Sequence, residues 1–368
     1  MNGDLTSGKA VRDQPFPGKI AIVTGHMSIN EDDFYSAEQL VEKYGNEKII
    51  HVTWPEDFLA EQNKMIDTLS TLAKDREINV LIINQALPGT NAAVDKFKET
   101  RNDVFIIYCT VHESIAEAAA RANLLLEINE LDMAQAMVKQ ARKQGAKVFV
   151  HYSFPRHMSQ PILSRCYNLI QEACAAEGIQ FVNSTALDPA VETGVSGARQ
   201  FILKDVPKLV AKYGEDTAFF CTNCALQAPL IKAVVDSHAI YPQPCCPSPS
   251  HGFPEALGID ADINHTNLNY IISEACRIAA EKNMTDRLST WPVSASMMFT
   301  NAGAEYAIMW INGLAPKTGI DDLVLEDCMN AYVEEVVGEG IDIEMVSCTE
   351  KGVTYDHFKQ ILMGYLDF

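Results

Sequence analysis

Short apolar runs alternate with longer amphipathic stretches along most of the chain. A run of four to six β-branched or aromatic residues is typical of a buried strand, whereas apolar residues three or four positions apart indicate a helix. In the first part of the chain the pattern predicts strands at 19–24, 48–53, 80–83, 104–109 and 124–128, and helices at 31–44, at 55–75, up to about residue 100, and at 131–144.

The same alternation starts again at residue 148. It predicts strands at 148–150, 179–182, 218–221 and 239–241, with helices at 160–177, 197–213 and 224–235. Residues 242–254 contain five prolines, and this composition predicts a long surface loop without regular structure. Two further helices are expected at 266–282 and 295–312.

Strands that alternate with helices of this length form parallel sheets with right-handed crossovers and helices on both faces. Because the alternation occurs twice, we predict an α/β fold of two similar doubly wound, Rossmann-like lobes joined by a hinge. The N-terminal lobe is expected to comprise 19–129 and about 292–320, and the C-terminal lobe 130–291 and about 321–368. Residues 1–18 are expected to be a disordered leader remnant.

Composition narrows the classes of partner. The 368 residues are 47% hydrophobic and 21% charged, with a net charge of −20. This acidic balance, without a dense cluster of Lys and Arg, argues against a nucleic-acid partner. No apolar segment approaches the roughly 20 residues that span a bilayer, and residues 1–18 lack a signal-peptide core. We therefore expect a soluble chain, with any leader or lipid anchor outside this sequence.

Polar and aromatic residues gather where the predicted strands end, most densely after the strand at 148–150. In open α/β folds ligands bind at this edge of the sheet. Amides offer donors and acceptors, arginine a planar fork and aromatic rings apolar walls, so a small polar solute with a flat or ring-like part is expected. The candidate ligand-binding residues are His26, Met27, Ser28, Asn84, Gln85, His112 and Glu113 in the first lobe, and Tyr152, Phe154, Arg156, His157, Asp188, Thr222 and Asn223 in the second. Arg156 has the alternative of an ion pair with a neighbouring acid.

Enzyme motifs are missing from the sequence. The turn at 25–30 has one glycine where a dinucleotide fingerprint needs three, and no nucleophile elbow, Walker loop or H-E-x-x-H helix occurs. His112 and Glu113 are neighbours at a predicted helix start, where their side chains point in different directions. We therefore expect no catalytic residue and no cofactor.

The ten cysteines leave two chemical alternatives open. Cys221-Thr-Asn-Cys224 has the C-x-x-C spacing of redox and metal sites, but no second pair follows at zinc-finger distance. Cys245 and Cys246, with His238 and His251 nearby, suggest a metal site in the proline-rich segment, although adjacent cysteines are awkward as paired ligands. Neither pattern is strong alone, so no metal is expected.

Several blocks carry a resemblance to a known superfamily. They are Ile22-Val-Thr-Gly25, His51-Val-Thr53, Asn84-Gln-Ala86 with Pro88-Gly-Thr90, Val150-His-Tyr-Ser-Phe-Pro-Arg-His-Met158, Gln200-Phe-Ile-Leu203 and Ala218-Phe-Phe-Cys-Thr-Asn223. The chain resembles type I periplasmic solute-binding proteins, which share their fold with the effector domains of sugar-responsive repressors. It is most similar to an uncharacterised family of bacterial lipoprotein-type ABC-transporter substrate-binding proteins.

The resemblance implies an exported protein, periplasmic or lipid-anchored, that captures a small solute between its lobes and delivers it to an ABC transporter permease. The absent leader and anchor cysteine and the high cysteine count depart from that pattern. The alternative is a ligand-sensing domain of a regulatory or signalling system. A DNA-reading repressor is disfavoured by the charge and by the 18 residues before the first strand.

Overall fold

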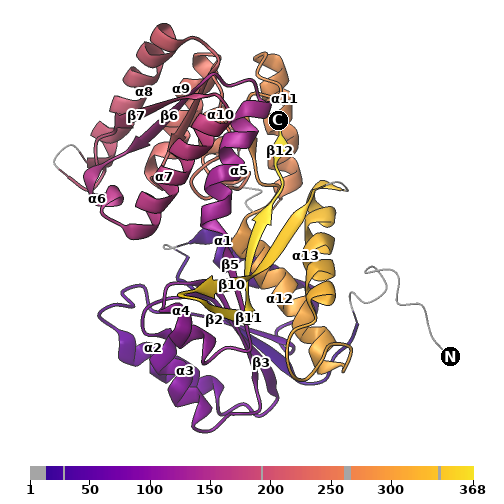
Figure 1. Ribbon diagram of the computed structural model, residues 1–368. Coiled ribbons are helices and arrows are strands. Elements are labelled where there is room, and N and C mark those ends of the chain that lie inside the picture. Colours follow the sequence, from indigo (N-terminus) through magenta and orange to yellow (C-terminus); the bar gives the residue numbers. More distant parts are fainter. Residues whose placement is uncertain (1–13, 28–29, 192–193, 261–266, 339–340) are drawn as a thin grey trace. The chain divides into compact units, whose positions relative to one another are not determined.

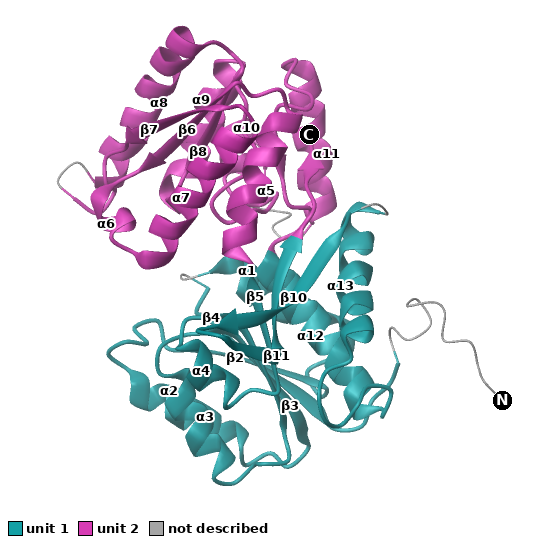
Figure 2. Cartoon of the chain, in the orientation of Figure 1, with its two compact units in different colours: residues 1–128, 295–362 teal, residues 129–294, 363–368 magenta. Residues whose placement is uncertain are grey.

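The computed structural model describes residues 14–27, 30–191, 194–260, 267–338 and 341–368. The chain forms two compact units, coloured separately in Figure 2. Unit 1 comprises residues 1–128 and 295–362, and unit 2 comprises residues 129–294 and 363–368. Within the described part of the chain, no helix is both long and apolar enough to cross a membrane.

Unit 1 is built on a seven-stranded sheet in the order β10-β11-β5-β4-β3-β1-β2. The strands are β1 (Lys19–Thr24), β2 (Ile49–Thr53), β3 (Ile78–Ala86), β4 (Phe105–Val111), β5 (Leu124–Ile128), β10 (Ile343–Glu350) and β11 (Val353–Met363). Strands β1 to β5 pair in parallel, with Ile20 in register with Ile49 and Val80. Their near-continuous apolar character fits a sheet that is covered on both faces.

Helices cover both faces of this sheet (Figure 1). They are α1 (Glu31–Tyr44), α2 (Gln62–Leu72), α3 (Thr90–Lys98), α4 (Ile115–Ala119), α12 (Ala295–Ile311) and α13 (Asp322–Val337). Helices α2 to α4 share a core with alternate strand residues such as Leu81 and Ile106. Helix α12 contacts β3 and β4, α1 and α13, and it is apolar nearly all round because it is buried on most sides.

The end of the chain corrects the expected lobe boundaries. Residues 321–362 were assigned to the C-terminal lobe, but they belong to unit 1. Helix α13 packs on α12, and β11 pairs in parallel with β5, with Phe358 opposite Leu125. The hairpin of β10 and β11 was not predicted. It turns on Lys351 and Gly352, which both have positive φ (51° and 79°), as a type I′ turn requires.

Unit 2 contains a parallel three-stranded sheet in the order β7-β6-β8. The elements are β6 (Val148–Ser153), β7 (Gln180–Thr185), β8 (Thr217–Cys221), α5 (Glu130–Lys143), α6 (Pro155–Met158), α7 (Pro161–Ala176), α8 (Gly194–Tyr213), η2 (Cys224–Leu226), α9 (Gln227–Asp236), α10 (Phe253–Leu257), α11 (Leu268–Glu281), β9 (Ser289–Thr290) and β12 (Leu366–Asp367). Isolated bridges join Ala218 to Ile240 and Tyr241 to Leu288, and β12 pairs with β9. Separate apolar cores on the two faces hold α8 to α11 on one side and α5 with α7 on the other.

The proline-rich segment at 242–254 is irregular as predicted, but most of it is buried, so the expected surface loop is wrong. Ser289 Oγ donates to the carbonyl of Pro242 at 2.7 Å, and the Tyr365 hydroxyl donates to Gln243 Oε1. These side-chain donors satisfy polar groups that would otherwise require water, which is how a segment without regular structure can lie inside a domain.

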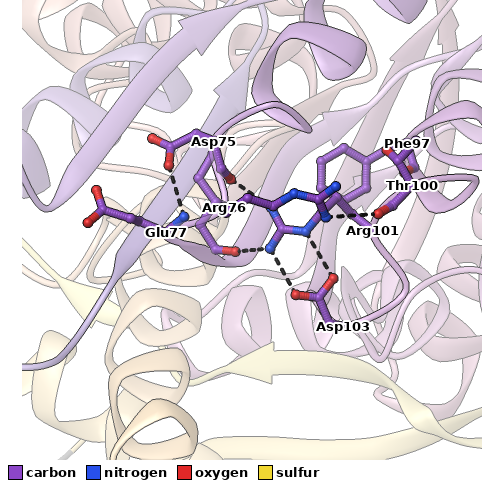
Figure 3. A network of polar contacts seen from close by, with 8 residues as sticks. Asp75, Arg76, Glu77, Phe97, Thr100, Arg101 and Asp103 are labelled. Atoms are coloured by element: carbon purple, nitrogen blue, oxygen red, sulfur yellow. Dashed lines mark hydrogen bonds and ion pairs between the residues drawn. The ribbon is translucent and has the colours of Figure 1, made fainter.

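A buried arginine holds the amino-terminal edge of the unit 1 sheet (Figure 3). Arg101, fully buried between α3 and β4, donates to the backbone carbonyls of Asp75 at 2.6 Å and Ile78 at 2.5 Å. Its guanidinium also makes two bonds to the Asp103 carboxylate, at 2.9 and 3.0 Å. Such a two-pronged pair with additional carbonyl acceptors offsets the cost of burying the charge. This edge is therefore structural.

Candidate functional site

The carboxyl ends of three neighbouring strands form the candidate site in unit 2. Ser153 at the end of β6 is in register with Thr185 of β7, and Tyr152 is in register with Cys221 of β8. Because the strands are parallel and paired, the loops that follow them lie side by side. Thr222, directly after β8, donates its backbone N–H to the Tyr152 carbonyl at 3.1 Å.

Arg156 and Asp188 pair across two of these loops. Arg156 lies in α6, after β6, and Asp188 lies in the loop after β7. Nε and Nη2 of Arg156 donate to the two carboxylate oxygens at 2.9 and 2.8 Å, and this bond lowers the pKa of Asp188 to about 2. The Arg156 side chain stays 50% exposed, and Nη1 makes no hydrogen bond to the described residues. The arginine is thus held in place with one edge of its fork facing solvent.

His157 is fixed by a chain of hydroxyl groups. The Thr222 hydroxyl lies 2.9 Å from His157 Nδ1 and 2.9 Å from the buried Ser153 hydroxyl. Partial burial, together with the charge of Arg156, lowers the pKa of His157 below its usual value, so the ring is neutral at pH 7. Nε2 has no partner among the described residues and can serve a ligand.

Two predicted aromatic contacts lie inside the core of unit 2. Tyr152 is fully buried; its hydroxyl donates to Asp205 at 2.9 Å, and burial raises its pKa far above the usual value. Phe154 is 2% exposed and lies under the loop, with the His157 ring 4.2 Å away and the Arg156 guanidinium 5.2 Å from its centroid. Phe154 therefore supports the two side chains above it, and neither ring presents a face to solvent.

Asn223 caps a short helix with its side-chain oxygen and leaves its side-chain nitrogen open. Its Oδ1 accepts the backbone N–H of Ala225 at 3.1 Å and caps the short helix η2, as an N-cap asparagine should. Its Nδ2 makes no hydrogen bond within the described part of the chain and is left for a ligand. Together with Arg156 and His157, it gives the edge three open nitrogens; those of Arg156 and Asn223 are donors that suit acceptor oxygens.

In unit 1 the predicted residues at the ends of β3 and β4 behave differently. Asn84 is fully buried, and its Nδ2 donates to the Ser296 carbonyl at 2.9 Å and to the Thr300 hydroxyl at 2.6 Å. Its Oδ1 accepts the backbone N–H of Gln85 at 3.0 Å. Asn84 thus ties β3 to α12 and has little capacity left for a ligand.

Gln85 and Thr110 adopt strained backbones at this same edge. They have φ of 50° and 51°, and they interrupt the β3–β4 ladder, in which Asn84 pairs with Cys109 and Ala86 with Val111. Left-handed backbone is unusual for any residue with a Cβ and more so for a β-branched one. Gln85 also has a buried Oε1 without a partner among the described residues. Strain and an unsatisfied acceptor on adjacent strands are features of binding sites.

The other predicted residues of unit 1 are divided between structure and surface. Glu113 Oε1 accepts the backbone N–H groups of Gly89 and Asn91, both at 3.0 Å, and so caps α3. His112 and Met27 are exposed, and His26 is half-buried. Ser28 lies outside the described residues.

Asp33 is a residue that sequence reasoning missed. It lies in the first turn of α1, where its charge suits the helix start, but its side chain is fully buried. Burial raises its pKa to about 7, a shift that the nearby Ser296 side chain partly opposes. The sequence has three consecutive acids at 31–33, and it does not indicate which of their side chains is buried.

Unit 1 also contains a row of three linked side chains, in which the His51 imidazole lies between the Glu38 carboxylate and the Thr24 hydroxyl. Nδ1 of His51 lies 2.5 Å from Glu38 Oε1, and Nε2 lies 2.9 Å from the Thr24 hydroxyl. The Thr24 hydroxyl is fully buried and donates to the Gly25 carbonyl, so a substrate has no path to it. The arrangement ties α1 to the ends of β1 and β2.

One hollow of about 390 Å³ lies away from these residues, at the amino-terminal side of β1 and β3. Its lining residues are Pro17, Gly18, Glu77, Asn79, Trp310, Ile311 and Lys317. Ligands of open α/β folds bind at the opposite edge of the sheet, where the edge residues described above lie.

Comparison with solved structures defines the class of fold. A crystal structure from Clostridium difficile 630, described as a candidate transcriptional regulator, matches with a TM-score of 0.85 at 21% identity, covering 96% of this chain and 100% of that one. An ABC transporter periplasmic solute-binding protein from Actinobacillus succinogenes 130z with bound D-allose matches with a TM-score of 0.50 at 13% identity, covering 83% and 96%. These likenesses show the fold alone. The predicted α/β architecture of the type I periplasmic binding proteins is confirmed.

Within that fold class, the chain belongs to the family described as "Protein of unknown function (DUF3798)", whose model matches residues 18–289. An uncharacterized protein of Treponema pallidum (strain Nichols) is 33% identical over 164 residues, which cover 45% of this chain and 76% of that relative. Residues 18–289, which the family model matches, include every candidate position of both units.

Proposed function

We propose that this chain is an extracytoplasmic solute-binding protein. It captures a small polar solute with side chains at the carboxyl ends of its parallel strands and delivers it to the permease of an ABC transporter. The observation that carries the proposal is the row of open groups at the edge of unit 2: Nη1 of Arg156, Nε2 of His157 and Nδ2 of Asn223. Each belongs to a side chain that a second bond already holds, so binding costs little side-chain entropy.

The nature of these groups indicates the class of solute. The open nitrogens of Arg156 and Asn223 donate, and the Arg156 charge is balanced by Asp188. Such a set favours a neutral or weakly anionic solute rich in acceptor oxygens, such as a sugar, a polyol or a nucleoside. The D-allose bound to the Actinobacillus succinogenes protein supports a solute of this size.

The proposal includes no chemical step. Three groups that resemble catalytic machinery are already used in the fold: Glu113 caps α3, Tyr152 is buried in the core, and Thr24 is inaccessible. A site of this kind binds and releases its solute unchanged.

A ligand-sensing domain of a regulatory system is the second candidate function. It is favoured by the likeness to the Clostridium difficile protein that is described as a candidate transcriptional regulator. It would use the same loops and pass the signal to a different partner. Fractionation of the native protein from its own cells separates the two, because a transport role predicts a protein outside the cytoplasm, either periplasmic or lipid-anchored at the cell surface.

A thermal-shift screen of aldoses, polyols, nucleosides and amino acids tests the proposed binding. A ligand at 100 times its Kd stabilises the folded state by about 2.7 kcal/mol, which raises Tm by about 3 to 4 °C in a protein of this size. Arg156→Ala should remove about half of that shift or more, the effect of a tenfold or greater loss of affinity. Arg277→Ala is the matched control, because Arg277 in α11 is also 50% exposed and also paired with carboxylates. If no compound in the panel shifts Tm, the proposal loses its support.

A further inference from the structure

Two segments that the sequence analysis treated separately meet in unit 2. Cys224 follows β8 at the start of η2, whereas Cys245 and His251 belong to the buried irregular segment 242–254. Sγ of Cys224 lies 3.4 Å from Sγ of Cys245, which lies 3.9 Å from Nε2 of His251. All three ligand atoms lie within 4.8 Å of one another. Cys224 comes from the C-x-x-C spacing at 221–224, and Cys245 and His251 come from the proline-rich segment; neither pattern indicated a metal site alone.

These separations are those of a metal site. Two thiolates that each lie about 2.3 Å from a tetrahedral zinc ion are about 3.8 Å apart, and a thiolate and an imidazole nitrogen are about 3.6 Å apart. The observed distances of 3.4 and 3.9 Å differ from these by a few tenths of an ångström. A disulfide between Cys224 and Cys245 would instead require the sulfurs to approach to about 2.0 Å, and it would leave His251 without a function.

The segment that carries two of the ligands is held firmly. Its backbone and side chains are anchored by Ser289 and Tyr365, as described above, and Ser250 bonds to Ser248 at 2.6 Å. Gly252, next to His251, has φ of 84°, and a Cβ there would lie 2.9 Å from Cβ of Gln227 in α9. Only glycine allows this approach, so the position of His251 against η2 and α9 is set by the fold.

Cys246, the sequence neighbour of Cys245, is a further thiol near the cluster. Sγ of Cys246 lies 3.8 Å from Sγ of Cys224. The group whose ligand atoms all lie within 4.8 Å of one another nevertheless consists of Cys224, Cys245 and His251, so we do not count Cys246 as a ligand.

We propose that Cys224, Cys245 and His251 bind a zinc ion. Two sulfurs and one imidazole suit zinc better than calcium or magnesium, which prefer oxygen. Cys224 is exposed and the other two ligands are partly so, which leaves the fourth coordination position open to solvent. The ligand Cys224 follows Thr222 and Asn223 directly in the chain, so the proposed ion lies at the edge of the candidate solute site. Zinc binding is independent of the proposed transport role, because it requires no solute.

The test uses the full chain, reduced and stripped of metal by a chelator under anaerobic conditions. On dialysis against Zn²⁺, wild type should retain about one equivalent by elemental analysis, as a single site requires. Co²⁺ in place of Zn²⁺ should give an intense thiolate-to-cobalt charge-transfer band, which reports sulfur ligation in wild type without any variant. Cys224→Ser, Cys245→Ser and His251→Ala should each weaken binding by about 100-fold or more, since even changes outside the ligand set cost 10- to 100-fold.

Cys246→Ser and Cys276→Ser are the matched controls and should retain the ion; Cys276 lies in α11 and is partly exposed like the ligands. A wild-type chain that takes up no zinc and gives no cobalt band would overturn the proposal. So would full binding by Cys245→Ser, or loss of binding by Cys246→Ser, which would move the site. A Cys224–Cys245 disulfide in the isolated chain, with no zinc uptake after its reduction, would also contradict it.

Discussion

The buried Asp33 carboxyl should make the stability of unit 1 depend on pH. Burial raises its pKa from 3.8 to about 7 in the folded chain, while the unfolded chain keeps the ordinary value. A raised folded pKa means that the fold prefers the protonated form. The stabilisation is therefore complete below about pH 4, and it is lost progressively as pH rises through about 7.

The expected size follows from these two pKa values. One pKa unit corresponds to 1.36 kcal/mol, so ionisation of Asp33 should reduce the free energy of unfolding by about 2 kcal/mol between about pH 5.5 and pH 8. Asp33→Asn cannot ionise. Relative to wild type, this variant should therefore gain about 2 kcal/mol in stability over the same interval.

Urea unfolding at several pH values measures this difference, with hydrogen exchange of α1 and β1 to follow unit 1 specifically. Glu31→Gln is the control, because Glu31 is an exposed acid in the same helical turn. Its stability relative to wild type should not vary with pH. A constant difference between Asp33→Asn and wild type from pH 5.5 to 8 would refute the reasoning, since it would mean that the carboxyl ionises normally.

Two further predictions concern unit 1. Arg101→Met should cost about 3 kcal/mol or more of stability, because it removes the buried guanidinium that donates to the Asp75 and Ile78 carbonyls and to the Asp103 carboxylate. Arg76→Met, at an exposed neighbour with one hydrogen bond, should change stability by less than about 0.5 kcal/mol in thermal unfolding. Equal effects would contradict the structural role of Arg101. Gln85→Gly should raise stability by about 1 kcal/mol, by relieving left-handed strain, and weaken solute binding. If Gln85→Gly binds solute as tightly as wild type, the strained backbone at residue 85 has no role in binding.

The fold was largely predictable because its signals are local. Each buried strand is a short run of β-branched residues, and helices such as α1 show apolar spacing with an Asn30 cap. The β10–β11 hairpin was missed because its strands mix exposed and buried residues, so they lack the apolar run of the central strands. Because the hairpin was not predicted, nothing in the sequence indicated that residues 321–362 belong to unit 1.

The candidate site was predictable in position and less so in detail. Strand ends mark the edge of the sheet, but which side chain turns inward depends on packing that no local pattern carries. Asn84 and Tyr152 were expected to face a ligand and instead bond to Thr300 and Asp205. The ion pair of Arg156 with Asp188 joins residues 32 positions apart, and it stood only as an alternative until the structure placed both.

The most direct test of the account is a calorimetric titration with a solute that shifts Tm, using wild type, Arg156→Ala and His112→Ala. Arg156 and His112 are exposed edge residues of unit 2 and unit 1, so neither change should disturb the core. Binding should be one to one, and each variant should weaken it by about tenfold or more, the loss expected for a polar contact worth about 1.4 kcal/mol. An affinity that falls with only one of the two variants, or turnover of the bound compound, would contradict it.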